Sequence, residues 1–247
     1  MDTESNINKF TVLTYNIDKR EYNMLERIVA FVNVIKVSMP DFVLLQETTK
    51  ISLEKLVREI HLLGYKRYIP DNERQRTTLE VIFTKYPVKK SFYIEFRMSP
   101  ERRGLTCING SIHDKYNIWL VTSQFDKNST LKKSQLTEMK PLLKKNGVDI
   151  TDNVIFGGDT GIFEYQKDIG CPDEWLDAWY EAGTDKEKYT IDYEKNPYVL
   201  QPHKDRPDRI WFSDNKRILC ENCEFFGEDS EIVISSHYGV LATFVLN

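Results

Sequence analysis

The sequence has no apolar run of about 18 residues, so no segment has the composition of a membrane-spanning helix. It also has no repeat, no low-complexity tract and no long linker rich in proline and glycine, so we expect a single domain over residues 10–247. Residues 1–9 are polar and acidic and lack the pattern of a secretion signal. We expect them to be flexible, and we expect an intracellular monomer, nuclear or cytoplasmic, that is neither secreted nor bound to a membrane.

Cysteine is also scarce, and the 34 Lys and Arg residues are outnumbered by 38 Asp and Glu. The four cysteines fit a reducing compartment; Cys220 and Cys223 have the spacing of a zinc pair, but no second ligand pair lies nearby, which favours a structural role. A net charge of −4 and a pI of about 5.7 exclude a protein-wide basic field. Contacts to nucleic acid must therefore come from local basic patches such as Arg102-Arg103, Lys132-Lys133 or Lys204-Arg206, each of which is more often simply a solvated face. Among these residues we expect Arg103 and Arg206 to bind substrate.

What the chain does have is a sizeable apolar fraction, 40% of its residues, arranged in many short segments of strand character. Predicted strands cover 10–15, 42–45, 65–69, 79–84, 89–96, 105–112, 117–123, 154–156, 208–212, 218–226 and 239–246. Predicted helices cover 21–37, 52–63, 130–145 and 174–182, with Ser52 as the candidate cap of the second. Many strands with a few helices between them indicate an α/β sandwich of two sheets.

The segment 153–160 is the most informative part of the chain. An apolar strand ends there in Gly157 and Gly158, which allow a sharp turn and a close approach of the backbone to a ligand. Asp159 follows at once, and a carboxylate at a strand end is a candidate metal ligand or general base. A plain surface turn explains this segment equally well when it is taken alone.

Four further polar residues lie at strand ends or starts: Asn16, Glu47, Asp208 and His237. With Asp159 they supply the groups that metal-assisted cleavage of a phosphodiester requires. Glu47 would hold a hard divalent cation such as Mg²⁺, and Asp159 would orient or deprotonate the attacking water. His237, held by Asp208, would stabilise charge on the phosphoryl oxygens.

These segments resemble the ordered motifs of the endonuclease/exonuclease/phosphatase superfamily, and within it the tyrosyl-DNA phosphodiesterase 2 family. The matching motifs are Leu13-Thr-Tyr-Asn-Ile-Asp18, Leu45-Gln-Glu47, Gly157-Gly-Asp159-Thr, Tyr189-Thr-Ile-Asp192, Arg206-Pro-Asp-Arg-Ile-Trp-Phe212 and Ser236-His237. The resemblance implies a four-layered α/β sandwich of two mixed β-sheets flanked by helices, the DNase I-like fold. It further implies a hydrolase dependent on Mg²⁺, with Mn²⁺ as a substitute, that cleaves the phosphotyrosyl bond between a protein and a DNA 5′ end. DNA rather than RNA is then the expected partner, and Asn16 joins the catalytic residues.

The chain departs from the family pattern at four positions. Gly161 replaces an Asn and has no side chain to bond a phosphoryl oxygen, and Ser236 replaces an Asp that helps to hold the metal. Gln124 stands where the family has His, and Ile191 where tyrosyl-DNA phosphodiesterase 2 has Trp. We expect Gln124 and Ser236 to contact the substrate.

Three functions remain open on the sequence alone. The first is the metal-dependent phosphodiesterase acting on a nucleic-acid end. The second is a catalytically impaired relative that binds nucleic acid or protein, which the residues at 161 and 236 favour. The third is a phosphatase acting on a small phosphorylated lipid or sugar, since one fold hosts many substrates.

Overall fold

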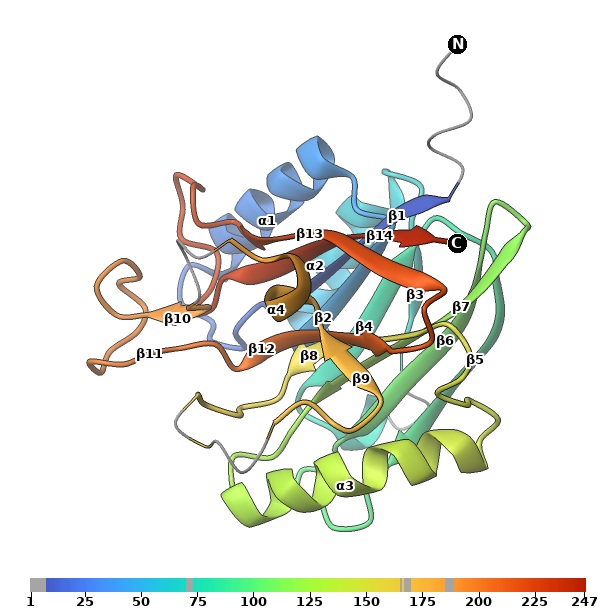
Figure 1. Cartoon of the computed structure of the whole chain (residues 1–247). Helices are drawn as coiled ribbons and strands as arrows, with labels where there is room; N and C mark the ends of the chain where they lie inside the picture. Colours follow the sequence, from blue (N-terminus) through green and yellow to red (C-terminus); the bar gives the residue numbers. More distant parts are fainter. Residues whose placement is uncertain (1–7, 70–72, 165, 167–169, 185–188) are drawn as a thin grey trace.

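The computed structural model describes residues 8–69, 73–164, 166, 170–184 and 189–247, which form two six-stranded sheets (Figure 1). The first sheet has the strand order β13-β14-β1-β2-β4-β3. It comprises β1 (Lys9–Asn16), β2 (Phe42–Thr48), β3 (Lys66–Tyr68), β4 (Leu79–Thr84), β13 (Ile218–Phe226) and β14 (Gly239–Leu246). The second has the order β5-β6-β7-β8-β12-β9. It comprises β5 (Val88–Glu95), β6 (Gly104–Ile112), β7 (Tyr116–Gln124), β8 (Val154–Asp159), β9 (Trp175–Asp177) and β12 (Asp208–Ser213).

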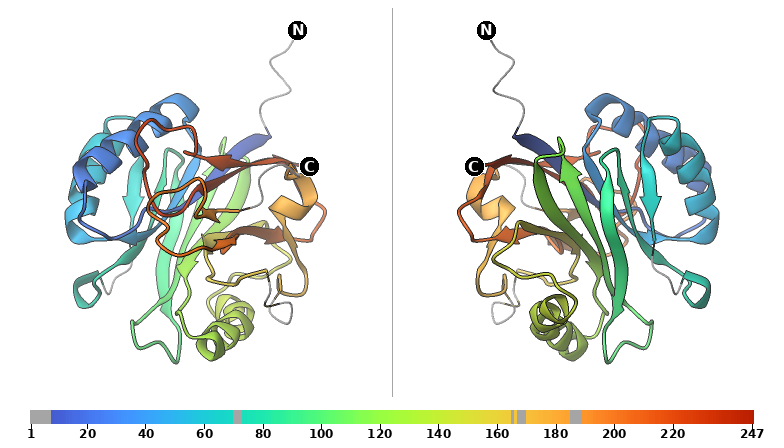
Figure 2. Two further views of the ribbon diagram at one scale, coloured as in Figure 1. Left: turned by 90° about the vertical axis from the view of Figure 1, so that its left-hand side faces the viewer. Right: turned by 90° about the vertical axis from the view of Figure 1, so that its right-hand side faces the viewer.

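The two sheets face each other and carry helices on their outer faces, as the views in Figure 2 show. Helices α1 (Met24–Ser38) and α2 (Lys50–His61) cover the first sheet, and α3 (Ser129–Lys145) covers the second. The short α4 (Ala178–Ala182), a 3-10 turn at Glu73–Gln75 and a hairpin of β10 (Ile191–Asp192) and β11 (Lys204–Asp205) complete the described elements. The predicted four-layered sandwich is confirmed.

Side-chain alternation along the strands builds the layers. In β1, Val12 packs between the sheets while Leu13 packs under α1 and α2. In β8, Ile155 packs between the sheets while Phe156 faces the α3 side. Each strand therefore contributes to two cores, and every second residue points into the space between the sheets.

The same alternation determines where polar side chains go at the strand ends. The pairs β1–β2 and β7–β8 are parallel, so each pair ends at one edge of its sheet. Asn16 is in step with the inward residue Val12, and Asp159 is in step with Ile155. Asp208 opposes Asp159 in the antiparallel pair of β8 and β12. The fold thus brings these three side chains to one edge of the inter-sheet layer.

The predicted helix over 174–182 is wrong in its first half. Trp175–Asp177 pairs with β12 as the edge strand β9, and the helix begins only at Ala178. The carboxylate of Asp177 caps that helix by accepting a hydrogen bond from the Trp179 N–H at 3.0 Å. Pairing with β12 therefore outweighed the local helical pattern.

Two terminal assignments also change. The cap of α2 is Thr49, and Ser52 takes the third helical position of a reciprocal capping box.

Of the segment 1–9 that we expected to be flexible, residues 1–7 lie outside the described residues. Asn8 hydrogen-bonds Leu246, and β1 begins at Lys9, so the boundary at residue 9 is wrong. None of the described helices is long and apolar enough to cross a membrane.

The glycine pair of β8 yields a stability prediction. A methyl group on Gly158 would collide with the backbone carbonyl of Ser123, whereas one on Gly157 would meet the Leu44 Cδ1 atom at 2.6 Å, at the end of a flexible side chain. We expect Gly158→Ala to lower the free energy of unfolding by about 1–3 kcal/mol. The effect should be larger than that of Gly157→Ala, because a side chain can rotate away from the added methyl whereas the strand backbone cannot move aside. Urea unfolding measures both, with Gly170→Ala as the control because nothing lies within 4 Å of the added methyl. Equal midpoints for Gly158→Ala and the control would contradict this packing.

Candidate active site

A hydrogen bond between the two sheets lies at the centre of the site. The Asn16 Nδ2 atom of β1 donates to the Asp159 Oδ2 atom of β8 at 2.9 Å. The other oxygen of Asp159 accepts the backbone N–H of Gly161 at 2.9 Å. Both side chains are buried, and both carboxylate oxygens act as acceptors, as an ionised Asp requires.

Glu47 reaches this site through an irregularity in β2. The register between β2 and β4 shifts after Leu45, and Glu47 has a left-handed backbone with φ of 55°. In a regular strand its side chain would face α1 and α2. Instead, its Oε1 atom accepts a hydrogen bond of 2.8 Å from Gln124 Nε2, which also donates to Asp159 Oδ2 at 3.2 Å. A neutral amide thus lies between two carboxylates, each from a different sheet.

A buried polar contact fixes the two sheets just below these groups. The amide of Gln46 donates to the hydroxyl of Thr14 at 3.1 Å and to the hydroxyl of Thr122 at 2.9 Å. All three side chains are inaccessible to solvent. Because buried polar groups need their partners, this contact restricts how β1 and β2 can shift against β7.

His237 and Asp208 form the second half of the site. The His237 Nδ1 atom lies 2.8 Å from Asp208 Oδ2, which also accepts the hydroxyl of Thr190 at 2.5 Å. Burial opposes protonation of His237, but the charges of Asp208, Asp159 and Glu47 outweigh it and raise the pKa of His237 to about 10. The imidazole is therefore protonated at neutral pH, and its Nε2–H can donate to an anion.

The site has the donors for a hard divalent cation. One ligand atom each from Asp159, Asp208 and His237 lie within 4.8 Å of one another. His237 Nδ1 is engaged by Asp208, and the oxygen donors at the site are carboxylates, among which those of Glu47 and Asp159 flank the neutral amide of Gln124. An all-oxygen set of this kind suits Mg²⁺ or Mn²⁺.

Asp18 received no assigned role from the sequence, beyond being a candidate, with Asp205, to compensate for the carboxylate missing at Ser236. Its Oδ2 atom accepts the hydroxyl of Ser236 at 2.8 Å and pairs with Arg20 at 2.7 Å. Burial raises the pKa of Asp18, but hydrogen bonds from Arg20 and Ser236 and the charges of Arg20 and Arg27 hold it below its usual value. The signal was present in the sequence, since Asp18 closes the Asn-Ile-Asp motif and its N–H bonds Asn16.

The buried Arg27 of α1 joins the loop after β1 to the segment that carries His237. Its guanidinium donates to four carbonyls of the loop and to one of the His237 segment, namely those of Ile17, Asp18, Arg20 and Tyr22 and that of Ile234. The Ser235 hydroxyl adds a bond of 2.6 Å to the Asn16 carbonyl and accepts the His237 N–H at 3.1 Å. The loop after β1 and the segment that carries His237 are thereby fixed to each other.

Of the residues predicted to bind substrate, Gln124 and Ser236 lie among the site groups, but the two arginines are engaged elsewhere. Arg206 is buried and pairs with Asp177 at 3.1 Å, which corrects its assignment as a substrate contact. Arg103 is also buried, and its guanidinium pairs with Glu101 at 2.5 Å. An Arg-rich segment in a sequence does not distinguish a buried ion pair from an exposed patch.

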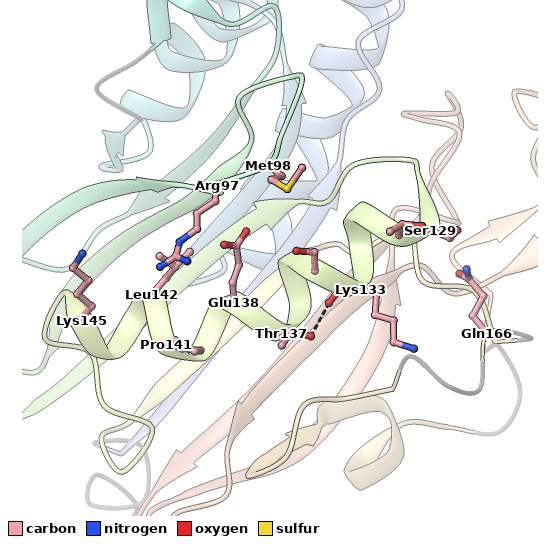
Figure 3. Close-up of a pocket in the computed structure, with 12 residues that line it drawn as sticks. Arg97, Met98, Ser129, Lys133, Thr137, Glu138, Pro141, Leu142, Lys145 and Gln166 are labelled. Atoms are coloured by element: carbon pink, nitrogen blue, oxygen red, sulfur yellow. Dashed lines mark hydrogen bonds between the residues drawn. The ribbon is translucent and has the colours of Figure 1, made fainter.

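A cleft of about 580 Å³ opens beside the site and includes Ser236. Its other lining residues are Arg20, Phe163, Ile191, Tyr198, Val199, Leu200, Gln201 and His203. A larger groove of about 1110 Å³ runs along α3 between Ser129 and Lys145 (Figure 3). Its lining includes none of the site residues, whereas the smaller cleft includes Ser236.

No model of a known protein family matches the sequence, and no curated protein matches it. Solved structures do superpose, and they define the fold as that of endonuclease/exonuclease/phosphatase proteins. The truncated TDP2 of Caenorhabditis elegans is 24% identical, with 96% of this chain and 97% of that one covered at a TM-score of 0.78. A D. rerio TDP2 complexed with single-strand DNA product is 20% identical, with 96% and 98% covered at 0.82. A mannosyl-6-phosphatase of Bacteroides thetaiotaomicron is 12% identical, with 96% and 100% covered at 0.78. These likenesses confirm the predicted fold.

The charge state of His237 can be measured directly. In metal-free buffer with chelator, we expect its imidazole to stay protonated until the pH approaches about 10, because folding raises its pKa above the usual 6.5. The folded state therefore gains stability that is complete below about pH 6.5 and is lost as the pH rises towards 10. Asp208→Asn should lower the pKa of His237, because it removes the neighbouring negative charge. Nitrogen-detected NMR of the ring measures both, with His237→Gln to assign the signal. Titration of His237 near its usual pKa would refute this charge state.

Proposed function

We propose that this protein is a divalent-metal-dependent phosphodiesterase that hydrolyses a phosphodiester at a nucleic-acid end, with a 5′-phosphotyrosyl link between protein and DNA as its substrate. The proposal places it as a monomer inside the cell, in the nucleus or cytoplasm. The observation that carries it is the convergence of Asn16, Glu47, Asp159, Asp208 and His237 at one edge of the inter-sheet layer.

The roles follow from the hydrogen bonds. Glu47, with Asp159 nearby, would hold Mg²⁺ or Mn²⁺, which would neutralise charge on the phosphoryl group. Asp159 orients the attacking water and accepts its proton, while Asn16 keeps the carboxylate in place through the bond to Oδ2. His237 donates from Nε2 to a phosphoryl oxygen, and Asp208 fixes the ring through Nδ1.

The cleft beside Ser236 supports a nucleic-acid substrate. The guanidinium of Arg20 lies over the ring of Tyr198 at 5.4 Å, and Phe163 packs edge-on against His203 with ring centroids 4.8 Å apart. Aromatic rings together with a cation suit the stacking of bases and the binding of a phosphate backbone. The D. rerio TDP2 with single-strand DNA product has the same fold, which supports DNA as the class of substrate.

A sugar phosphate is the second candidate substrate. The Bacteroides mannosyl-6-phosphatase superposes at a TM-score of 0.78, so this architecture accommodates phosphomonoester chemistry. The cleft of about 580 Å³ is large enough for a sugar as well as a nucleotide. Its aromatic lining favours the nucleotide.

We expect purified protein with millimolar Mg²⁺ to release tyrosine from a 5′-phosphotyrosyl oligonucleotide, and Asp159→Asn and His237→Ala to reduce turnover by at least about 10²-fold, because each removes a group that acts on the reacting phosphate. His113→Ala is the matched control, since this exposed histidine follows the last residue of β6, away from the candidate site. Glu47→Gln should raise the Mg²⁺ concentration needed for half-maximal rate.

Separate reactions identify the substrate class. Chelator should stop turnover, Mn²⁺ should restore it, and mannose 6-phosphate should release less phosphate than the oligonucleotide releases tyrosine. Absence of turnover with either metal, alongside salt-sensitive binding of the same oligonucleotide, would overturn the enzymatic proposal in favour of a binding module.

A further inference from the structure

Lys132 is a buried cation next to the catalytic carboxylate. It lies in the first turn of α3 and is 4% exposed, although the neighbouring Lys133 is exposed. Its Nζ atom donates to the carbonyl of Gly161, and the N–H of Gly161 donates to Asp159 Oδ1 at 2.9 Å. A single residue, Gly161, therefore links the ammonium to the carboxylate that orients the attacking water, through its C=O on one side and its N–H on the other.

The lysine lies next to the space that a side chain at position 161 would enter. Gly161 has φ of +55°, and a Cβ atom added to it would lie 3.4 Å from Lys132 Cδ and 3.5 Å from Lys132 Nζ. Gly161 therefore has no side-chain donor, but the ammonium of Lys132 from α3 lies next to it.

The ammonium has hydrogen-bonding capacity left over. It carries three N–H groups, and among the described residues it donates to one acceptor, the Gly161 carbonyl. Nζ also lies 5.1 Å from the ring centroid of Phe163, a residue that lines the substrate cleft. The charge is therefore held between the Asp159 loop and the cleft, where a phosphoryl oxygen can receive a hydrogen bond.

We propose that Lys132 is a catalytic residue that donates a hydrogen bond from Nζ to a non-bridging phosphoryl oxygen and stabilises the negative charge that develops there. The proposal rests on the phosphodiesterase function proposed above. Lysine keeps its proton throughout, because the water's proton goes to Asp159 and the phosphorus–oxygen bond to the leaving group breaks. A desolvated ammonium at fixed distance stabilises such charge more strongly than a solvated one.

Kinetics separate this role from a purely structural one. Lys132→Met keeps the length and the packing of the side chain but removes the charge, and we expect kcat to fall by about 10²–10³-fold with little change in KM. Lys133→Met, one residue further on the same helix, is the matched control and should keep wild-type kcat. Lys132→Arg should recover part of the loss, because a cation returns.

A rescue variant tests the space argument. In Lys132→Ala the cavity beside residue 161 opens, and adding Gly161→Asn supplies an amide donor from the other side of it. Asn tolerates a positive φ better than most residues, so the backbone can accept it. We expect the double variant to exceed Lys132→Ala in kcat by at least about tenfold. If Lys132 only tethers the Gly161 loop, Lys132→Met should lose thermal stability and the double variant should show no recovery of kcat.

Equilibrium binding tests the proposal without turnover. In chelator, wild-type protein should bind a 5′-phosphorylated oligonucleotide more tightly than its 5′-hydroxyl counterpart, and Lys132→Met should lose most of that difference while Lys133→Met retains it. If wild type shows no turnover with either metal, the proposed function fails, and this difference still decides the role of Lys132 as a phosphate ligand. Unchanged kcat or unchanged phosphate discrimination in Lys132→Met would overturn the proposal.

Discussion

The hydrogen bond between Asn16 and Asp159 joins the two sheets where the candidate site is assembled. The rest of the site depends on the distance between the two sheets. Each sheet supplies half of the groups: β1 and β2 bring Asn16 and Glu47, while β8 and β12 bring Asp159 and Asp208. The spacing is set below them by the apolar layer between the sheets and by the buried amide of Gln46, which bonds across it. The glycine pair of β8 has no side chains, and this allows the close approach.

The electrostatics of this edge argue for a bound cation. Four carboxylates gather here, from Asp18, Glu47, Asp159 and Asp208, and three of them have a charged partner nearby: Arg20 beside Asp18, His237 beside Asp208, and Lys132 close to Asp159. Glu47 accepts hydrogen bonds only from the amide of Gln124 and the N–H of Lys19 in the described structure, and both are neutral. A divalent cation at Glu47 would balance that charge.

Period-two alternation predicts part of this site and local backbone geometry determines the rest. Asn16, Asp159 and Asp208 follow from strand registers that the sequence indicates, because each lies in step with apolar residues that must point between the sheets. Glu47 reaches the site through a bulge and a left-handed φ, which no periodicity shows. Arg206 was misassigned because charge alone does not reveal the buried Asp177 beside it. The sequence offered Lys132 only as half of a basic pair with Lys133, because the helical face of each lysine becomes known only when α3 is packed on its sheet.

The departures from the superfamily motifs have counterparts elsewhere in the chain. The carboxylate absent at Ser236 is supplied by Asp18, 2.8 Å from the serine hydroxyl. The donor absent at Gly161 is matched by the ammonium of Lys132, which occupies the space beside that glycine. At Gln124 the amide still bonds the two carboxylates it lies between, although it brings no charge. Both counterparts are buried charges with partners, since Asp18 pairs with Arg20 and Lys132 donates to the Gly161 carbonyl. Their positions beside the proposed reacting groups support the proposed catalytic site over a silent binding surface.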